Sequence, residues 1–437
     1  MSQVVAYVLG IVVLIIGIGL SVALHELGHM IPAKRFGVKV PEYFIGFGPR
    51  LWSVKRGETE YGVKAIWLGG YVKLLGMVPP AKPGRTDKPD SMVADARAES
   101  LAELGPDEQH RAFYRLSVPK KLIVMAGGIL TNLTLGVILL ALALGVVGQS
   151  AYTSTLASVS ACVPADVDAA SACADAGAPS PAAAAGLRVG DEIRSWNGAP
   201  TATWAQVQQA IRASGTAPAA VVVERDGQEL TLTVTAVEVP RTVYAADGSV
   251  VTGADGEPLT EQRPYVGIGP ALGTQRTSPS QIPAVVGTAV GQTLRAIVTL
   301  PVGLYHAVAA GLGAEKRNPE GLVSLVGVGR IAGEVSSAGA GSGTVPFSVR
   351  LFSMLSLLGS LNLALFAFNL IPLLPLDGGH VAGALWEGAR RRIARRRGLP
   401  DPGYVDTARM LPVGQAVFVL LIIMTLVLVW VDVVAPL

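Results

Sequence analysis

Four apolar stretches constrain this chain more than any other feature of its sequence. They run over Val4 to Met30, Leu122 to Val147, Leu351 to Leu374 and Ala416 to Val434. Each could cross a hydrocarbon core of about 30 Å, which needs roughly 20 helical residues. With 50% hydrophobic and only 15% charged residues among 437, the chain is too apolar for an ordinary soluble enzyme of this size. We therefore expect a polytopic α-helical membrane protein with four transmembrane helices.

Lysine and arginine are distributed unevenly around these stretches. The segment between the first two carries a basic excess near its ends, and the segment between the last two contains the basic run Arg390 to Arg397. Residues 149–280 contain no lysine and are net acidic. Because cytoplasmic loops are enriched in Lys and Arg, we expect residues 149–280 to be extracytoplasmic. The basic run is explained by topology and the anionic lipid bilayer, and no nucleic-acid partner is expected.

The first apolar stretch ends in the sequence His25-Glu26-Leu27-Gly28-His29. On a helix, His25 and His29 lie one turn apart on the same face and can both bind one Zn²⁺, with Glu26 beside them to handle a proton. The pattern alone arises often by chance. Its position favours function, because imidazoles and a carboxylate in an apolar span are costly unless they bind a ligand or pair with each other.

A catalytic zinc usually has three protein ligands and one open position. The third apolar stretch runs into Asn369-Leu370-Ile371-Pro372-Leu373-Leu374-Pro375-Leu376-Asp377-Gly378. Its prolines interrupt the helix, and the freed backbone groups must line a cavity or be covered by protein. Asp377 in that stretch is a candidate third ligand; alternatively, it could cap the following helix.

The two motifs together resemble the site-2 protease family of intramembrane metalloproteases, and in particular its bacterial regulator-of-sigma-E branch and actinobacterial relatives. The resemblance implies that His25, His29 and Asp377 bind zinc and that Glu26 is the catalytic glutamate, acting as general base. It also implies that Asn369 holds the substrate backbone or polarises its carbonyl. His380 matches no catalytic position, and a structural role is expected for it.

Other segments extend the resemblance over most of the chain. Gly69, Gly70 and Tyr71 begin a segment to Met77 that resembles the family's membrane-associated β-hairpin and could bind substrate. The segment from Ala126 to Asn132 resembles the Gly-Pro-x-x-Asn element, with Ile129 where the family usually has proline. Asn132 is expected to face the active-site cavity.

Residues 185–198 have a Gly-Leu-x-x-Gly-Asp-x-Ile pattern, followed by a predicted helix and two strands. The pattern resembles one PDZ domain, an α+β fold, at about residues 180–240. PDZ folds bind peptide ends by adding a strand to a sheet edge, so this domain could filter substrates or bind a freshly cut end. A plain packing module is the alternative.

The expected organisation is an N-terminal half of the membrane core at residues 1–148, an extracytoplasmic region at 149–280, and a linker with the C-terminal half at 281–437. Cys162 and Cys173 both fall in the extracytoplasmic region, where a disulfide or a pair of free thiols is possible. The stretch from Pro79 to Arg111 is expected to be a loose cytoplasmic loop.

The resemblance implies a metalloendopeptidase of the bacterial cell membrane that cuts transmembrane segments, with its active site near the cytoplasmic side. Membrane-spanning anti-sigma factors and remnant signal peptides are the implied substrates. Two alternatives are an inactive PDZ-bearing scaffold, which would have no use for Glu26, and a metal transporter, although no inverted repeat is evident.

Overall fold

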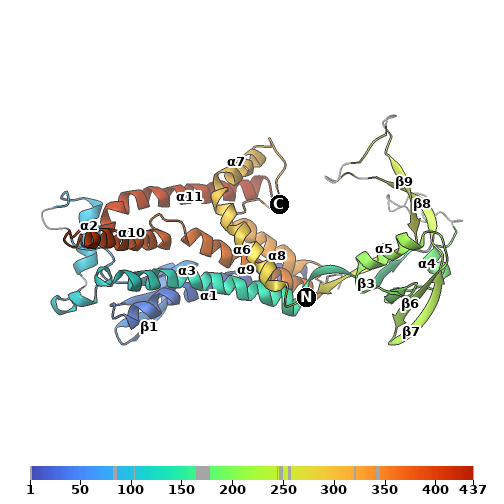
Figure 1. The fold of residues 1–437 in the computed structure, drawn as a ribbon, viewed down its shortest axis with the longest axis horizontal. Coiled ribbons are helices and arrows are strands. Elements are labelled where there is room, and N and C mark those ends of the chain that lie inside the picture. The colour runs from blue at the N-terminus through green and yellow to red at the C-terminus, as the bar shows by residue number, and fades with distance from the viewer. Residues whose placement is uncertain are drawn as a thin grey trace. The chain divides into compact units, whose positions relative to one another are not determined.

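The computed structural model describes residues 2–436 except 82–85, 103, 164–177, 244, 246–249, 254–256, 319–320 and 341–344. The chain divides into two units (Figure 1). Unit 1 comprises Met1–Val146, Thr277–Thr344 and Arg350–Leu437, and unit 2 comprises Val147–Arg276 with Val345–Val349. The helical unit 1 therefore contains all four apolar stretches, and the β-rich unit 2 is inserted between the second and third.

Four helices among the described residues are long and apolar enough to cross a membrane. They are α1 (Gln3–Arg35), α3 (Val118–Leu142, extended by a π-helical turn to Val147), α9 (Phe347–Asn369) and α11 (Leu411–Val434, preceded by a 3-10 turn from Thr407). Only 17% to 33% of the most apolar window of each span is buried in the protein. The remaining apolar surface needs lipid around it, which confirms four candidate transmembrane helices.

The third span both begins and ends earlier in the chain than expected. The α9 helix ends at Asn369 rather than continuing to Leu374, because Pro372 and Pro375 cannot continue its hydrogen-bond ladder. An irregular segment, which includes a cis Leu374–Pro375 peptide, leads to α10 (Asp377–Arg396). A helix break therefore places Asp377 at the start of a new helix, beyond the end of the span.

Three further helices of unit 1 lie between the second and third spans in the sequence. They are α6 (Ile282–Val298), α7 (Leu300–Gly311) and α8 (Leu325–Ser337). The α6 and α7 helices are bent by 75° at their junction, and α7 packs against α11 through Ala307, Leu428 and Val431. The sequence interpretation did not identify this bent pair.

A hairpin of two long strands, β1 (Glu42–Arg56) and β2 (Thr59–Lys73), follows α1. Both strands fold back on themselves, since Tyr43 of β1 is paired with Tyr61 and also with Val72. The result is four short segments in the order 70–73, 42–45, 60–63 and 52–56, antiparallel at the two outer pairings and with partners that run in the same direction at the central one. Segments 70–73 and 52–56 form the two edges of this small sheet.

The stretch from Pro79 to Arg111 is not the loose loop that was expected. Its described part contains α2 (Met92–Ala102) and a 3-10 helix (Pro106–Arg111). Arg97 of α2 is buried and pairs with Asp87 at 2.7 Å and with Asp406 at 3.1 Å. Ionic contacts with a distant part of the chain thus order this segment, and its local composition does not reveal them.

The described residues of unit 2 form antiparallel strands and two helices. Its main sheet has the order β10-β3-β4-β6-β7, with β5 paired to β4, and β8 pairs with β9. The bounds are β3 (Gln149–Val159), α4 (Pro181–Ala184), β4 (Glu192–Trp196), β5 (Ala199–Pro200), α5 (Trp204–Ser214), β6 (Ala219–Arg225), β7 (Gln228–Val234), β8 (Val237–Thr242), β9 (Thr260–Tyr265) and β10 (Ile268–Gln275).

The core of unit 2 is formed by apolar side chains from α5 and the sheet, among them Ile193, Trp196 and Val207. Next to it, the carboxylate of Asp191 is 1% exposed and forms two hydrogen bonds with the Arg225 guanidinium, at 2.7 and 2.8 Å. A bidentate pair of this kind fixes both groups in one geometry. Cys162 is buried and is not a free thiol, whereas Cys173 lies outside the described residues.

Helices α1 and α3 pack with direct backbone contact. A Cβ atom added at Gly127 of α3 would overlap the carbonyl of Gly28 on α1, and one added at Gly28 would lie 2.6 Å from the Gly127 carbonyl. Only glycine permits this approach, since both neighbours are backbone atoms that cannot rotate away.

We expect Gly127→Ala to lower the thermal unfolding temperature of the detergent-solubilised protein, because overpacking costs about 1–3 kcal/mol. Gly287→Ala is the matched control, as a Cβ there meets no atom within 4 Å. That control should leave the temperature unchanged or raise it slightly, since alanine favours helix. Equal unfolding temperatures for the two variants would contradict the close packing.

Candidate metal centre

The side chains of His25 and His29 project from the same face of α1, one turn apart. Their ring centroids are 4.8 Å apart and their Nε2 atoms are 3.2 Å apart. Gly128 of α3 faces both rings, and a Cβ there would overlap His29. The glycine thus leaves the space that the two imidazoles occupy.

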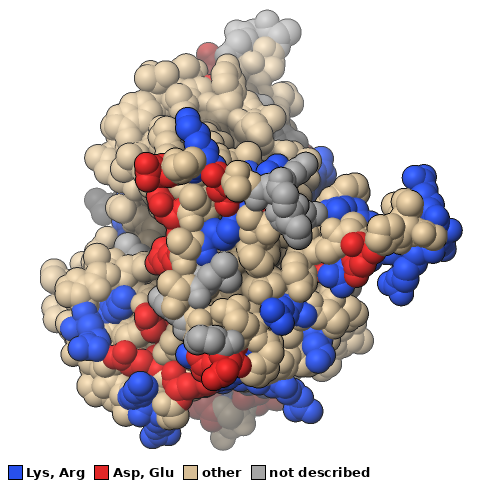
Figure 2. All heavy atoms as spheres, turned by 90° about the vertical axis from the view of Figure 1, so that its left-hand side faces the viewer, with Lys and Arg blue, Asp and Glu red and all other residues tan. Residues whose placement is uncertain are grey.

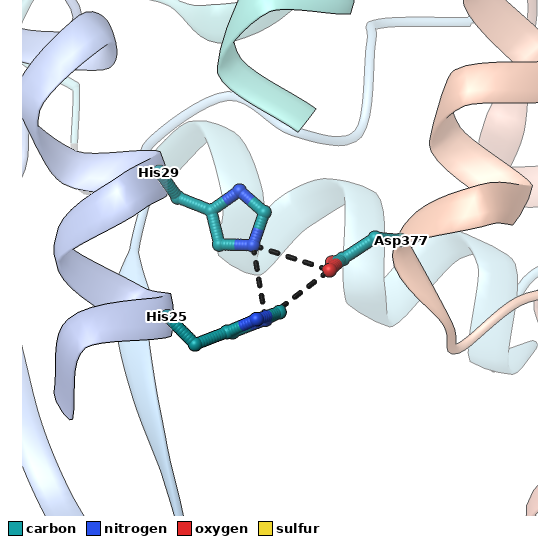
Figure 3. Close-up of side chains that lie close together, drawn as sticks. All are labelled: His25, His29 and Asp377. Carbon is teal, nitrogen blue, oxygen red and sulfur yellow. Dashed lines mark hydrogen bonds and ion pairs between the residues drawn. The ribbon is translucent and has the colours of Figure 1, made fainter. Parts of the chain in front are cut away.

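Asp377 completes a triangle of donor atoms. Its Oδ2 atom lies 3.2 Å from Nε2 of His25 and 3.2 Å from Nε2 of His29, as Figure 3 shows. Asp377 is the first residue of α10, and the helix cap is Leu376, so its carboxylate points to the histidines rather than capping the helix.

These distances fit zinc. Tetrahedral zinc with ligand bonds of about 2.0–2.1 Å separates its ligand atoms by about 3.3 Å, and all three separations here are 3.2 Å. Two imidazoles and one carboxylate form a donor set found in catalytic zinc sites, where the fourth position stays open. In the part of the chain that the structure describes, this is the one group of three His, Cys, Asp or Glu side chains arranged to hold a metal.

Each histidine has a partner for its second ring nitrogen. Nδ1 of His29 lies 2.8 Å from the Val124 carbonyl oxygen, to which it donates a proton, leaving Nε2 free for a metal. Nδ1 of His25 lies 3.0 Å from the Asn132 amide. Oδ1 of that amide is buried and has no partner among the described residues. Flipping the Asn132 amide exchanges its oxygen and nitrogen, so that Oδ1 accepts the Nδ1–H of His25. A metal-bound histidine needs such an acceptor.

Glu26 faces the hairpin. The backbone N–H of Val72 donates a hydrogen bond to its carboxylate, and the Cβ position of Gly70 lies 3.6 Å from Glu26 Cγ. The edge segment 70–73 of the small sheet therefore runs directly beside the carboxylate that neighbours the three donor atoms.

Comparison with known proteins agrees with this geometry. Residues 13–400 match the model of peptidase family M50. The chain belongs to the M50 peptidase family. It is 35% identical to the zinc metalloprotease Rip1 of Mycobacterium tuberculosis H37Rv and 31% identical to Rip1 of Mycolicibacterium smegmatis, with 98% of each chain covered. It is 27% identical to the metalloprotease MmpA of Caulobacter vibrioides, over 90% of this chain and 89% of that protein.

The resemblance to the site-2 protease family is thereby confirmed. Membership in M50, with the similarity to zinc metalloproteases over nearly the whole chain, makes this protein a zinc-dependent metalloendopeptidase. Its four apolar helices make it a multi-pass membrane protein. The scaffold and transporter alternatives lose their support.

Other predicted site residues of this M50 peptidase lie in different surroundings. Asn369 is the last residue of α9, is half-buried, and makes no side-chain hydrogen bond within the described part of the chain. Tyr71 turns its hydroxyl to Glu42 at 2.6 Å and stacks on Phe44, while its backbone lies in the edge segment. Gly69 has φ +146° and lies at the bend that precedes that segment. The half-buried His380 follows Asp377 by one turn of α10.

A buried ion pair that the sequence did not reveal joins α3 to the helix that carries Asp377. Lys121 Nζ lies 2.8 Å from Glu387 Oε2, and the side chains are 8% and 3% exposed. The same oxygen accepts the Val405 N–H at 3.2 Å. Removing one partner of such a pair leaves an uncompensated buried charge. The pair therefore fixes α10 against α3, the helix that also contacts both histidines.

We expect Asp377→Ala to abolish stoichiometric zinc in purified protein, measured by inductively coupled plasma mass spectrometry, because it removes one of three donors. Asn132→Ala should weaken zinc affinity by about 10–100-fold in a chelator competition, the usual effect of losing the partner of a histidine ligand. Asp401→Ala, on an exposed loop, is the control. Full zinc retention by Asp377→Ala would contradict the assigned site.

Proposed function

We propose that this M50 peptidase hydrolyses peptide bonds within the transmembrane segments of other membrane proteins. The convergence of His25, His29 and Asp377 on one point carries the proposal, because it combines donors from an apolar span and from the helix after a broken span. Polar groups at such a depth are functional by default. A substrate that is itself membrane-embedded is the one that can reach them.

The proposed reaction uses the residues around this point. Zinc, when bound, supplies a Lewis acid that makes water nucleophilic at neutral pH. Glu26 accepts the proton of the attacking water and delivers it to the leaving nitrogen. The Val72 N–H orients the Glu26 carboxylate, and Asn369 holds the substrate backbone or polarises its carbonyl. Contacts of the two Nδ1 atoms with Val124 and Asn132 hold the rings of His29 and His25 in position.

A transmembrane substrate must unwind before attack, since helical hydrogen bonds shield its peptide groups. The edge segment offers a template for the unwound chain. The Val72 N–H points to Glu26 and is therefore not used in pairing with β1. Backbone groups of successive residues in a strand point to opposite sides, so Gly70, Val72 and Leu74 direct theirs to the free edge. A strand added there would run beside Glu26.

The proposed topology follows from charge. His29 is followed by Lys34 and Arg35 in the same helix, a rise of about 8 Å at 1.5 Å per residue. Lysine and arginine mark the cytoplasmic end of a span. The proposed active site is therefore near the cytoplasmic side of a bacterial cell membrane, and residues 149–280 are extracytoplasmic.

Membrane-spanning anti-sigma factors and remnant signal peptides are the substrates we propose, from the resemblance to site-2 proteases. Both have a single apolar segment, which fits a site reached from within the bilayer. Helix-loosening residues in that segment should favour cleavage.

Residues 180–240 are proposed to form a PDZ domain that binds peptide ends. A groove of about 240 Å³ lies between α5 and the segment around Tyr265, and Arg212, Arg241 and Arg263 are among its lining residues. Arginines suit the carboxylate of a peptide C-terminus. The domain would engage the freshly cut end of a substrate, or exclude substrates with bulky outer parts.

Purified protein in detergent should cut single-span model substrates within the span, with cut positions mapped by mass spectrometry. Glu26→Gln should retain zinc but lose at least 100-fold in rate, since general acid–base catalysis contributes about 10²–10⁴. Glu334→Gln, an exposed carboxylate on α8, is the control. Undiminished cleavage by Glu26→Gln would refute the mechanism, and wild type that cuts nothing would revive the scaffold and transporter alternatives.

Proline at Gly70 or Tyr71 should slow cleavage of a tightly helical substrate more than cleavage of one loosened by glycine, because the edge template matters most when unwinding is costly. The measurement is the ratio of the two rates for each variant. Lys55→Pro on the opposite edge segment is the control and should leave the ratio unchanged. Equal slowing of both substrates by the Gly70 and Tyr71 variants would count against strand addition.

A further inference from the structure

A groove of about 470 Å³ runs along the backbone that continues from the edge segment. One wall is the stretch from Tyr71 to Val78, and the other is α2, which contributes Ala96, Glu99 and Ser100. The groove begins beside Val72, whose N–H contacts Glu26. A chain lying next to Glu26 could therefore continue into this groove, although β2 itself ends at Lys73 and the backbone of the wall turns at Gly76, where φ is +69°.

The groove has a defined far end. Ser100 Oγ of α2 accepts the N–H of Val78 at 3.2 Å and donates to the Val78 carbonyl at 3.3 Å. This hydroxyl occupies both backbone groups that a paired strand would use. Strand pairing stops even earlier, since β2 ends at Lys73 and the carbonyls of Leu75 and Gly76 accept the N–H groups of Phe113 and Tyr114. Beyond Lys73, a bound peptide must therefore be held by side chains rather than by strand pairing.

Buried ion pairs fix the position of the α2 helix that forms this wall. Arg97, one turn before Ser100, pairs with Asp87 and Asp406 and donates to the Pro79 carbonyl. Its side chain is 8% exposed, so these contacts are shielded from solvent and resist screening. Side chains on the groove face of α2 thus keep fixed positions relative to the strand.

The charged side chains of the lining are Glu42, Lys73 and Glu99. Glu42 accepts the Tyr71 hydroxyl, and Lys73 has an interaction partner already. Glu99 is exposed and makes no ion pair in the described part of the chain. Figure 2 looks onto this end of unit 1, where Asp and Glu side chains form a broken band with Lys and Arg on either side. The groove therefore offers one uncommitted carboxylate to a ligand.

We propose that this groove binds the extended cytoplasmic flank of the substrate and that Glu99 selects a basic residue in that flank. The inference rests on the proposed function, because it places the cut segment beside Glu26. Residues that flank a transmembrane segment on the cytoplasmic side are enriched in Lys and Arg, which is the chemistry that Glu99 complements. Glu99 is thus a specificity-determining residue of the protease.

The test uses full-length protein and three single-span substrates that differ only in their cytoplasmic flank, which carries two lysines, two glutamines or two glutamates. Wild type should have the lowest KM for the lysine flank. Glu99→Gln should raise that KM by about 1.4- to fivefold, the effect of one exposed ion pair, with kcat unchanged. Glu99→Lys should cut the glutamate-flanked substrate better than wild type does.

Ala98→Lys is the matched control. It changes the net charge by the same amount as Glu99→Gln, but Ala98 is exposed outside the groove lining, so the flank preference should persist. Equal cleavage of all three substrates by wild type, or the same loss of preference in Ala98→Lys, would overturn the inference and leave the proposed function intact. Failure of wild type to cut any of the three would overturn the proposed function itself.

Discussion

The structure depends on the high cost of unpartnered polar groups in hydrocarbon. Two histidines near the end of an apolar helix and a carboxylate after a broken one can be accommodated only if they meet, and they do so at equal separations of 3.2 Å. The glycines of α3 allow that meeting, because their missing side chains let α1 approach closely. The proline-rich break then turns the chain so that α10 can present Asp377. The close packing of α1 on α3 and the helix break before α10 thus act together to bring the three metal ligands to one point.

Sequence reasoning reached the spans and the histidine pair because these depend on composition and spacing within a few residues, and it reached Asp377 through the proline-broken span and the resemblance to a known family. It missed the contacts that join distant segments. The ion pair between Lys121 and Glu387 spans 266 positions, and Arg97 reaches Asp406 across 309. The Val124 carbonyl and the Val72 N–H are backbone groups. Every residue except proline has both groups, so no residue type in the sequence indicates which of them will bind a side chain. The roles of Asn369, Gly69 and Tyr71 toward substrate stay predictions.

The hairpin links chemistry to recognition. Its two strands fold back into four segments, so that one edge lies beside Glu26 while the other lies on the far side of the sheet. From that first edge, the backbone continues into a groove whose second wall, α2, belongs to a segment with no obvious sequence signal. A bound peptide would thus pass the proposed general base and then the α2 wall, where Glu99 is the charged side chain that the helix contributes.

The order of the metal ligands along the chain has a consequence for biosynthesis. His25 and His29 lie in the first span, but Asp377 follows 348 residues after His29. A ribosome-bound chain that has not yet reached α10 holds only two of the three donors and none of the support from Glu387. The newly inserted protein would therefore remain inert toward its neighbours in the membrane until nearly all of it has been translated and its helices have assembled.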